Sequence, residues 1–274
     1  MLKATATTEW TENILTMVKK IFGVLTLGLG SLAVACPNPQ TVQEDIKKIF
    51  KAPLKVVEVR PAPVKGLCEA ITSLGGEKYI FYTDESGRYL LLGSRPFVNI
   101  FDLKNLENIT RKELEELNKL SPEQVKELDK YVAFTYGTKG KTVYLFTDPE
   151  CPFCQRLEPT LKKLADEGKI KIKVILFPLW FHPHAKEKAV AMVCKNIGWK
   201  GLSNEYWTSE KMKQLKNWQC ERGKELIEKS IKLGNKIGVS GTPTMITQSG
   251  KKVVGALPEA QLKKELGLED NGTK

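Results

Sequence analysis

The sequence contains only 21 glycines, 14 prolines and 2 histidines among its 274 residues. Glycine and proline at this level exclude a collagen-like or low-complexity chain, and the 41% hydrophobic and 27% charged residues exclude a disordered tail. Internal repeats, zinc-finger spacings and runs of mixed aromatic and basic residues are absent, which argues against nucleic-acid binding. Length and hydrophobic content instead predict two modest domains.

Positive charge is concentrated in the C-terminal part of the chain. The net charge is +11, but residues 37–110 hold 10 basic and 9 acidic residues, whereas residues 141–274 hold 24 and 15. Lysines of the second region are interleaved with glutamates, a pattern typical of a solvated surface. We therefore expect no nucleic-acid partner.

The first 35 residues have the pattern of an export signal. Lys19 and Lys20 precede an uncharged run at 21–35, which ends in the Ala-Val-Ala pattern that signal peptidases cut. Fifteen helical residues span about 22 Å, which is shorter than the roughly 30 Å hydrocarbon core of a bilayer. We predict a signal peptide over 1–35, with Met17 as the favoured true start.

Export changes how the cysteines are interpreted, because an oxidising compartment lets disulfides persist. The six cysteines are Cys36, Cys68, Cys151, Cys154, Cys194 and Cys220. Cys36 stands directly after the predicted cut, where a bacterial lipoprotein carries its acylated cysteine, so lipid anchoring there competes with ordinary cleavage. Cys68 is expected to be a lone, buried small hydrophobic residue, with an additional disulfide as the open alternative.

Residues 38–105 are predicted to form a small α+β domain. Thr41 and Glu44 have the spacing of a helix capping box, and the apolar residues after them share one helical face. Extended runs bounded by turn residues follow at 54–60, 79–83, 88–92 and 97–101. We expect one helix on a small antiparallel sheet.

Residues 106–138 are predicted to form a helical linker. A capping box at Thr110 and Glu113 opens one polar helix, and Ser121-Pro122 opens a second. Both helices are too charged to be buried on two sides, so we expect a solvated connector between the domains.

Residues 139–274 are predicted to form an α/β domain with a β-α-β half and a β-β-α half. Strands are expected at 142–147, 171–177, 244–248 and 252–255, with a helix to Asp166 and a last helix from Pro258. Between the halves, an insertion at 183–236 has helical spacing and contains Cys194 and Cys220.

The CxxC pair lies where an apolar strand meets an amphipathic helix. A helix N-terminus stabilises a thiolate, and only the thiolate attacks a disulfide, so Cys151 is predicted to be the nucleophile. Cys154, one turn later, is spaced to resolve a mixed disulfide and should be the less exposed sulfur. Between them, Pro152-Phe153 lacks a proton donor, and Glu150 adds a negative charge, so we expect only a modestly lowered pKa for Cys151.

Two alternative readings of these residues stay open. CxxC with His182 and His184 could bind zinc, although a CxxC at a strand–helix junction is usually redox-active. Cys194 and Cys220 could form a structural disulfide, which would stabilise the insertion by roughly 3 to 4 kcal/mol in the chain-entropy model, or a second redox pair.

The segments TVYLFTDPECPFC and NKIGVSGTPTMITQSGKKVVGALPEAQLKKEL resemble the DsbC/DsbG family of periplasmic disulfide isomerases. RPAPVKGLCEAI is similar to that family's N-terminal domain. The resemblance implies a thioredoxin-like catalytic domain, a cystatin-like dimerisation domain, and a cis Thr242–Pro243 bond beside the sulfurs. Cys194 and Cys220 fall where members carry a structural disulfide. Independently of the resemblance, Pro243 cannot donate to a sheet ladder, which leaves backbone near Thr242 free to bind an extended substrate.

These observations together predict thiol:disulfide interchange that isomerises or reduces wrong disulfides in exported proteins, without a cofactor or a metal. The expected partners are misfolded disulfide-containing proteins, a membrane thiol reductant that keeps the CxxC reduced, and a second copy of the chain. The expected location is the periplasm. Net oxidase or reductase activity, and a holdase chaperone that binds unfolded clients, are the alternatives.

Overall fold

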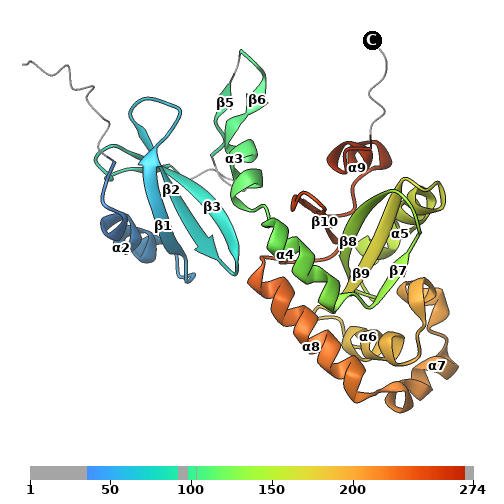
Figure 1. Ribbon diagram of the computed structural model, residues 1–274. Coiled ribbons are helices and arrows are strands. Elements are labelled where there is room, and N and C mark those ends of the chain that lie inside the picture. The colour runs from blue at the N-terminus through green and yellow to red at the C-terminus, as the bar shows by residue number, and fades with distance from the viewer. Residues whose placement is uncertain (1–35, 92–97, 103, 269–274) are drawn as a thin grey trace, which may run out of the picture. The chain divides into compact units, whose positions relative to one another are not determined.

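The computed structural model describes residues 36–91, 98–102 and 104–268 (Figure 1). The predicted signal peptide lies outside the described residues, as do Leu92 and Phe97 at the ends of two predicted strands. In the described part of the chain, no helix is long and apolar enough to cross a bilayer.

The N-terminal part consists of one helix and an antiparallel sheet in the order β1-β2-β3-β4 (Figure 1). Its elements are α2 (Pro39–Ile49), β1 (Lys55–Pro61), β2 (Leu67–Leu74), β3 (Glu77–Asp84) and β4 (Leu90–Leu91). Helix α2 buries Val42 and Ile46 against Ala70 and Phe81 of the sheet. The expected arrangement of one helix on a small antiparallel sheet is therefore present.

Strand β2 is missing from the predicted strands, although it is central in the sheet. Neighbouring residues of this strand face different cores, with Ala70 in the cluster under α2 and Ile71 in the cluster with Tyr82. The strand also buries the polar residues Glu69 and Thr72. Burial on both faces removes the apolar–polar alternation by which a half-buried strand is recognised.

Both predicted capping boxes in this part are wrong. Helix α2 begins two residues before Thr41, because Asn38 accepts the Gln40 N–H at 2.8 Å and proline follows as the first helical residue. Asn108 caps the linker helix α3 (Ile109–Leu117). The hydroxyl of Thr110 instead lies 2.6 Å from the hydroxyl of Tyr82 in a buried hydrogen bond.

Cys36 and Cys68 form a disulfide with an S–S distance of 1.99 Å. The expectation that Cys68 is a lone buried residue is therefore wrong, although its side chain is fully buried. Lipid anchoring at Cys36 is excluded in this state, because an acylated cysteine has no free sulfur to form a disulfide. Because Cys36 was interpreted as the residue after the cleavage site and as a candidate for lipidation, its pairing with Cys68 was not predicted.

The linker region contains a short hairpin and three helical segments. These are β5 (Phe101–Asp102), β6 (Glu107–Asn108), α3, α4 (Pro122–Glu127) and the 3-10 helix η1 (Leu128–Tyr131). Ser121 caps α4 with a capping box, as its position before proline predicts. However, Val125 and Leu128 pack against Tyr144 and Phe146. The expectation of a fully solvated connector is therefore wrong for α4 and η1.

The C-terminal part is built on a five-stranded sheet in the order β11-β10-β8-β9-β7. The strands are β7 (Phe134–Tyr136), β8 (Lys141–Thr147), β9 (Ile170–Leu176), β10 (Thr244–Thr247) and β11 (Lys252–Val254). Strands β8 and β9 are parallel, and the other pairs are antiparallel. Four strands lie where the sequence predicts them. The fifth strand, β7, has three residues and lies in the predicted linker. The predicted boundary of the C-terminal domain at residue 139 stays a prediction.

Helices cover both faces of this sheet (Figure 1). They are α5 (Pro152–Asp166), α6 (Ala185–Cys194), α7 (Ser209–Gln214), α8 (Glu221–Lys236) and α9 (Glu259–Glu265), with 3-10 segments η2 (Gly198–Leu202), η3 (Asn204–Tyr206) and η4 (Leu215–Trp218). In β8, Val143 and Leu145 face the core that contains α5, whereas Tyr144 and Phe146 face the core that contains Leu233 of α8. Burial on both faces explains the continuous apolar run before the CxxC pair.

Candidate active site

Cys151 is the N-cap residue of α5, and Pro152 is the first residue of that helix. The Cys151 N–H donates to the Asp148 carbonyl at 3.1 Å, which turns the chain from the end of β8 into the helix. Cys154 follows in the first turn of α5, and both cysteines are free thiols. The strand–helix junction predicted from the sequence is therefore present.

The two sulfurs have opposite pKa shifts. The pKa of Cys151 is well below its usual value, mainly because the Cys154 thiol donates to its thiolate. Burial opposes this shift, whereas the nearby Thr242 and the N–H groups of Phe153 and Cys154 add to it. The pKa of Cys154 is raised, because its proton is held in that hydrogen bond and because the thiol is buried. This arrangement provides one thiolate and one protonated reserve thiol.

The expected difference in exposure between the sulfurs is not present at the level of whole residues. Cys151 and Cys154 are each 2% exposed. The two cysteines therefore differ in pKa and in their place on the helix rather than in exposed area.

The loop before β10 contacts the dithiol at Cys151. The Thr242–Pro243 peptide bond is cis, and the Cys151 sulfur lies 3.3 Å from the Thr242 carbonyl oxygen, to which it donates when it is protonated. The Pro243 carbonyl accepts the Gly255 N–H at 2.8 Å. Thr242 and Pro243 therefore lie beside the reactive sulfur, where the sequence places substrate binding.

Glu150 does not oppose the Cys151 thiolate in the way that the sequence suggests. Its carboxylate lies 2.6 Å from Lys188 Nζ and accepts the His184 N–H at 2.9 Å. Burial raises the pKa of Glu150, but these two partners outweigh it and hold the pKa below its usual value. The negative charge is neutralised by Lys188, and the modest pKa shift predicted for Cys151 is an underestimate.

The two histidines do not join the cysteines. The His182 Nδ1 atom lies 2.8 Å from an Asp148 carboxylate oxygen, and His184 Nδ1 lies 3.5 Å from Glu187. Within residues 36–91, 98–102 and 104–268, no group of three or more Cys, His, Asp or Glu residues is arranged to hold a metal ion.

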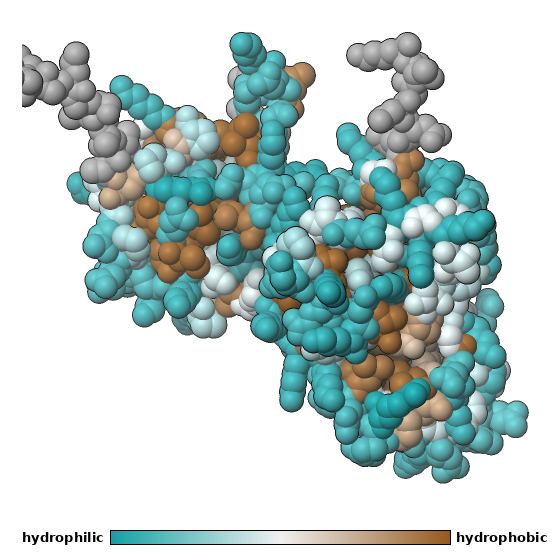
Figure 2. All heavy atoms as spheres, viewed as in Figure 1, coloured by the Kyte–Doolittle hydropathy of each residue, from teal (hydrophilic) through white to brown (hydrophobic). Residues whose placement is uncertain are grey.

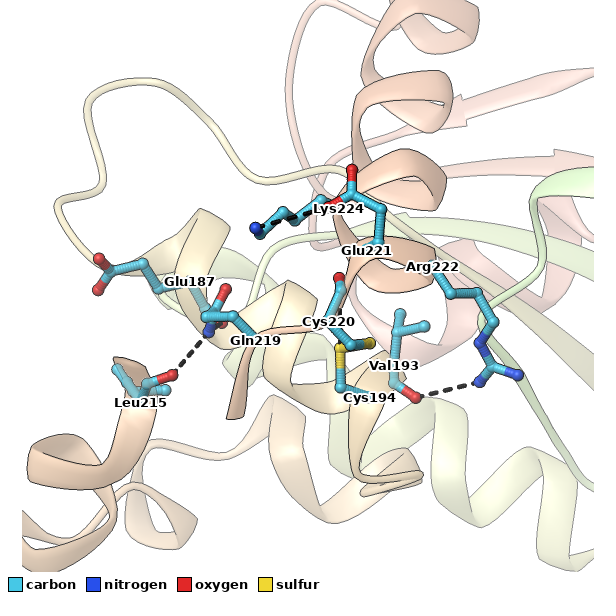
Figure 3. The surroundings of a disulfide bond; sticks show 9 residues. All are labelled: Glu187, Val193, Cys194, Leu215, Gln219, Cys220, Glu221, Arg222 and Lys224. Carbon is cyan, nitrogen blue, oxygen red and sulfur yellow. Dashed lines mark hydrogen bonds and ion pairs between the residues drawn. A yellow bond between two sulfur atoms is a disulfide. The ribbon is translucent and has the colours of Figure 1, made fainter. Parts of the chain in front are cut away.

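Cys194 and Cys220 form a disulfide that joins the end of α6 to the start of α8 (Figure 3). Nearby, Arg222 donates to the Val193 carbonyl at 3.3 Å, and Gln219 donates to the Leu215 carbonyl at 2.8 Å. A Cβ at Gly223 would lie 2.5 Å from the Cys194 sulfur, so the close approach of the two helices requires glycine there. The disulfide lies in the insertion, away from Cys151 in the sequence.

Two family models together cover most of the chain. A thioredoxin-like domain matches residues 129–268, and the disulfide bond isomerase protein N-terminal domain matches residues 33–111. The chain is a DsbC-type member of the thioredoxin superfamily. In this DsbC-type protein, the thioredoxin-like region contains the CxxC pair and the cis-proline loop described above.

Curated relatives and solved structures resemble this DsbC-type chain. The probable thiol:disulfide interchange protein DsbC of Bordetella avium is 29% identical over 83% of this chain and 76% of its own length. DsbC of Pasteurella multocida is 28% identical over 91% and 99%. Among solved structures, the catalytic domain of Proteus mirabilis ScsC has 18% identity and a TM-score of 0.43, over 54% of this chain and 98% of its own.

Sequence reasoning missed two acidic residues of the DsbC-type site. Asp148 is fully buried, and it accepts the Leu179 N–H at 2.7 Å and the Glu150 N–H at 2.7 Å. Glu158 is 8% exposed, and its Oε1 atom is one of three buried side-chain polar atoms without a partner in the described chain. Asp148 lies three residues before Cys151, close enough to the motif to be considered from the sequence, whereas nothing near Glu158 in the sequence marks it.

The other two such atoms are the hydroxyl oxygens of Thr147 and Thr242. Both residues lie near the dithiol and lower the pKa of its thiols, Thr147 that of Cys154 and Thr242 those of both cysteines. Unsatisfied polar groups in this domain therefore gather around the CxxC pair, as is common at functional sites.

Proposed function

We propose that this protein catalyses thiol:disulfide interchange in exported clients and works mainly as an isomerase of wrong disulfides. The observation that supports this most directly is the pairing of a low-pKa Cys151 at a helix N-terminus with a high-pKa, buried Cys154. The names of the DsbC relatives support the same activity.

In the first step, the Cys151 thiolate attacks one sulfur of a client disulfide. The client S–S bond breaks, a Cys151–client disulfide forms, and the other client sulfur leaves as a thiolate. The Thr242 carbonyl lies beside Cys151, and once Cys151 is ionised and no longer donates to it, we propose that it pairs with the extended client segment.

Two outcomes complete the cycle. A different client thiolate can attack the mixed disulfide, which forms a new client disulfide and returns Cys151 as thiolate. Alternatively, Cys154 loses its proton and attacks the Cys151 sulfur, which releases a reduced client thiolate and leaves Cys151–Cys154 oxidised. The second outcome consumes two electrons, which we propose a membrane thiol reductant returns.

We propose a periplasmic location for this chemistry. The predicted signal peptide supports it, and so do the Cys36–Cys68 and Cys194–Cys220 disulfides, because such bonds persist in oxidising compartments.

We further propose that residues 38–105 form a homodimer. Figure 2 shows apolar side chains at the surface of the N-terminal part. More than a third of each of the side chains Ile49, Val57, Val64, Tyr89 and Leu91 is exposed. Apolar exposure on this scale in a small domain is typical of an interface. A dimer would present two dithiols to one client and raise their effective concentration.

Sedimentation of the chain from Cys36 tests the dimer. We expect a mass of two chains, and the Tyr89→Asp, Leu91→Asp variant should shift toward one chain. A single-chain mass for the unaltered protein contradicts the dimer.

Trapping the mixed disulfide tests the exchange chemistry. The Cys154→Ala variant should accumulate clients bound through Cys151, seen as reducible adducts on non-reducing gels, whereas Cys151→Ala should accumulate none. If the double variant without both cysteines prevents client aggregation as well as the unaltered protein does, while Cys154→Ala traps no client, the protein is a holdase instead.

A further inference from the structure

Four large apolar side chains are exposed between residues 119 and 268, and all four belong to segments around the dithiol. They are Phe153, Trp180, Phe181 and Val254, with exposed fractions of 53%, 92%, 57% and 55%. Phe153 lies inside the CxxC motif, and Val254 pairs in register with Thr244, the residue after the cis-proline. Apolar side chains left in solvent around a reactive centre indicate a contact surface.

The segment that carries Trp180 and Phe181 is anchored to the active-site loop. At one end, the buried Asp148 carboxylate accepts the Leu179 N–H at 2.7 Å and binds His182 Nδ1 at 2.8 Å. At the other end, Glu150 accepts the His184 N–H at 2.9 Å. The loop that precedes Cys151 therefore fixes both ends of the segment.

The two aromatic rings face solvent between these anchors. Trp180 and Phe181 contact each other edge to face with a centroid distance of 5.5 Å, and Phe181 contacts the His182 ring at 4.6 Å. Rigid, preorganised aromatic side chains bind a partner with little loss of conformational entropy.

A groove of about 600 Å³ lies between this segment and α8. Its walls include Trp180, Phe181, Ile231 and Val239. The charged residues Lys186 and Glu228 at the groove pair with each other. Because the two charges satisfy each other, the groove is suited to an apolar side chain rather than a charged one.

The groove ends two residues before Thr242 along the chain, near the place where a client would be attacked. Val239 and Ser240 line it, and Thr242, whose carbonyl accepts from Cys151, is two residues further along. An extended strand advances about 3.3 Å per residue. A client segment paired with the backbone at Thr242 therefore reaches the groove within about two residues of its cysteine.

We propose that the Trp180–Phe181 segment and this groove form a docking subsite for an extended client segment that has an aromatic or large aliphatic side chain within two residues of its reactive cysteine. The proposal rests on the proposed exchange at Cys151 and adds a sequence preference to it. Misfolded clients expose such apolar side chains beside their cysteines, whereas folded proteins bury them.

The experiment compares two peptide disulfides that are identical except at the position two residues from the cysteine. One peptide has Phe at this position and the other has Ser. The rate of mixed-disulfide formation is measured with the full-length protein in its reduced form. We expect the Phe peptide to react about 10-fold faster, which is typical of a hydrophobic subsite. The Trp180→Ser, Phe181→Ser variant should reduce this ratio to near 1.

Leu106→Ser is the matched control, because Leu106 is 82% exposed and lies between β5 and β6, outside the residues that line the groove. That variant should keep the ratio of the unaltered protein. Because each ratio compares two peptides on one protein, a general change in Cys151 reactivity cancels. Equal rates for both peptides, or a ratio that survives the double substitution, would overturn the subsite. Failure of the unaltered protein to react with either peptide would instead overturn the proposed exchange function.

Discussion

Glu158 should make the folded protein less stable as the pH rises from about 4.5 to about 7. Burial and the nearby Cys151 thiolate raise its pKa from 4.5 to about 7, and one of its oxygens has no hydrogen-bond partner among the described residues. Between these two pH values the folded state binds more protons than the unfolded state, so stability falls as pH rises. One pKa unit corresponds to about 1.4 kcal/mol, so the full loss is about 3 kcal/mol.

The Glu158→Gln variant removes this titration while keeping the size of the side chain. Urea unfolding should show a small difference between the variant and the unaltered protein at pH 4. By pH 8 the variant should gain about 3 kcal/mol relative to the unaltered protein. Oxidation of the dithiol removes the thiolate charge, so the gain should be smaller in the oxidised protein.

Glu205→Gln is the matched control for this experiment. Glu205 is exposed and lines the same cavity of about 530 Å³ as Glu158. Its substitution measures the effect of replacing an exposed carboxylate by an amide at the same cavity. A pH-independent difference for Glu158→Gln, or a variant less stable than the unaltered protein at pH 8, would refute the reasoning.

Three further predictions concern the cysteines and their surroundings. The alkylation rate of Cys151 in the reduced protein should stay nearly constant between pH 8 and pH 7, whereas that of an ordinary thiol falls about tenfold. Cys154 should be alkylated far more slowly. Equal rates for the two cysteines by mass spectrometry would contradict the pKa assignment. Replacing Cys194 and Cys220 together by Ala should lower the free energy of unfolding by roughly 3 to 4 kcal/mol in the chain-entropy model, and an unchanged urea midpoint would show that the disulfide is not structural. Gly223→Ala should destabilise the protein by about 1 to 3 kcal/mol through overpacking, although alanine is usually the better helix former, and a stabilised variant would show that the helices can separate.

The chemistry of the dithiol could be predicted from the sequence because its signals are local. An apolar run, a CxxC pair and an amphipathic helix adjoin one another, and their order places Cys151 at a helix N-terminus. Strands β8 to β11 and the last helix were predicted on the same basis, from continuous apolar runs and turn residues.

The contacts that modify the dithiol could not be predicted in this way, because they join distant segments. Lys188 neutralises Glu150 across 38 residues, and His182 binds Asp148 across 34. Glu158 looks like an ordinary helical glutamate until the packing around α5 buries it. Each of these depends on how elements pack, which spacing along the chain does not reveal.

The isomerase assignment is tested most directly by refolding a scrambled multi-disulfide substrate with the full-length protein supplied either reduced or oxidised. We expect the reduced protein to restore native disulfides, the oxidised protein to do so much more slowly, and Cys151→Ala to abolish the rescue. Recovery only with the oxidised protein, on a reduced substrate, would contradict the account and assign the chain as a net oxidase.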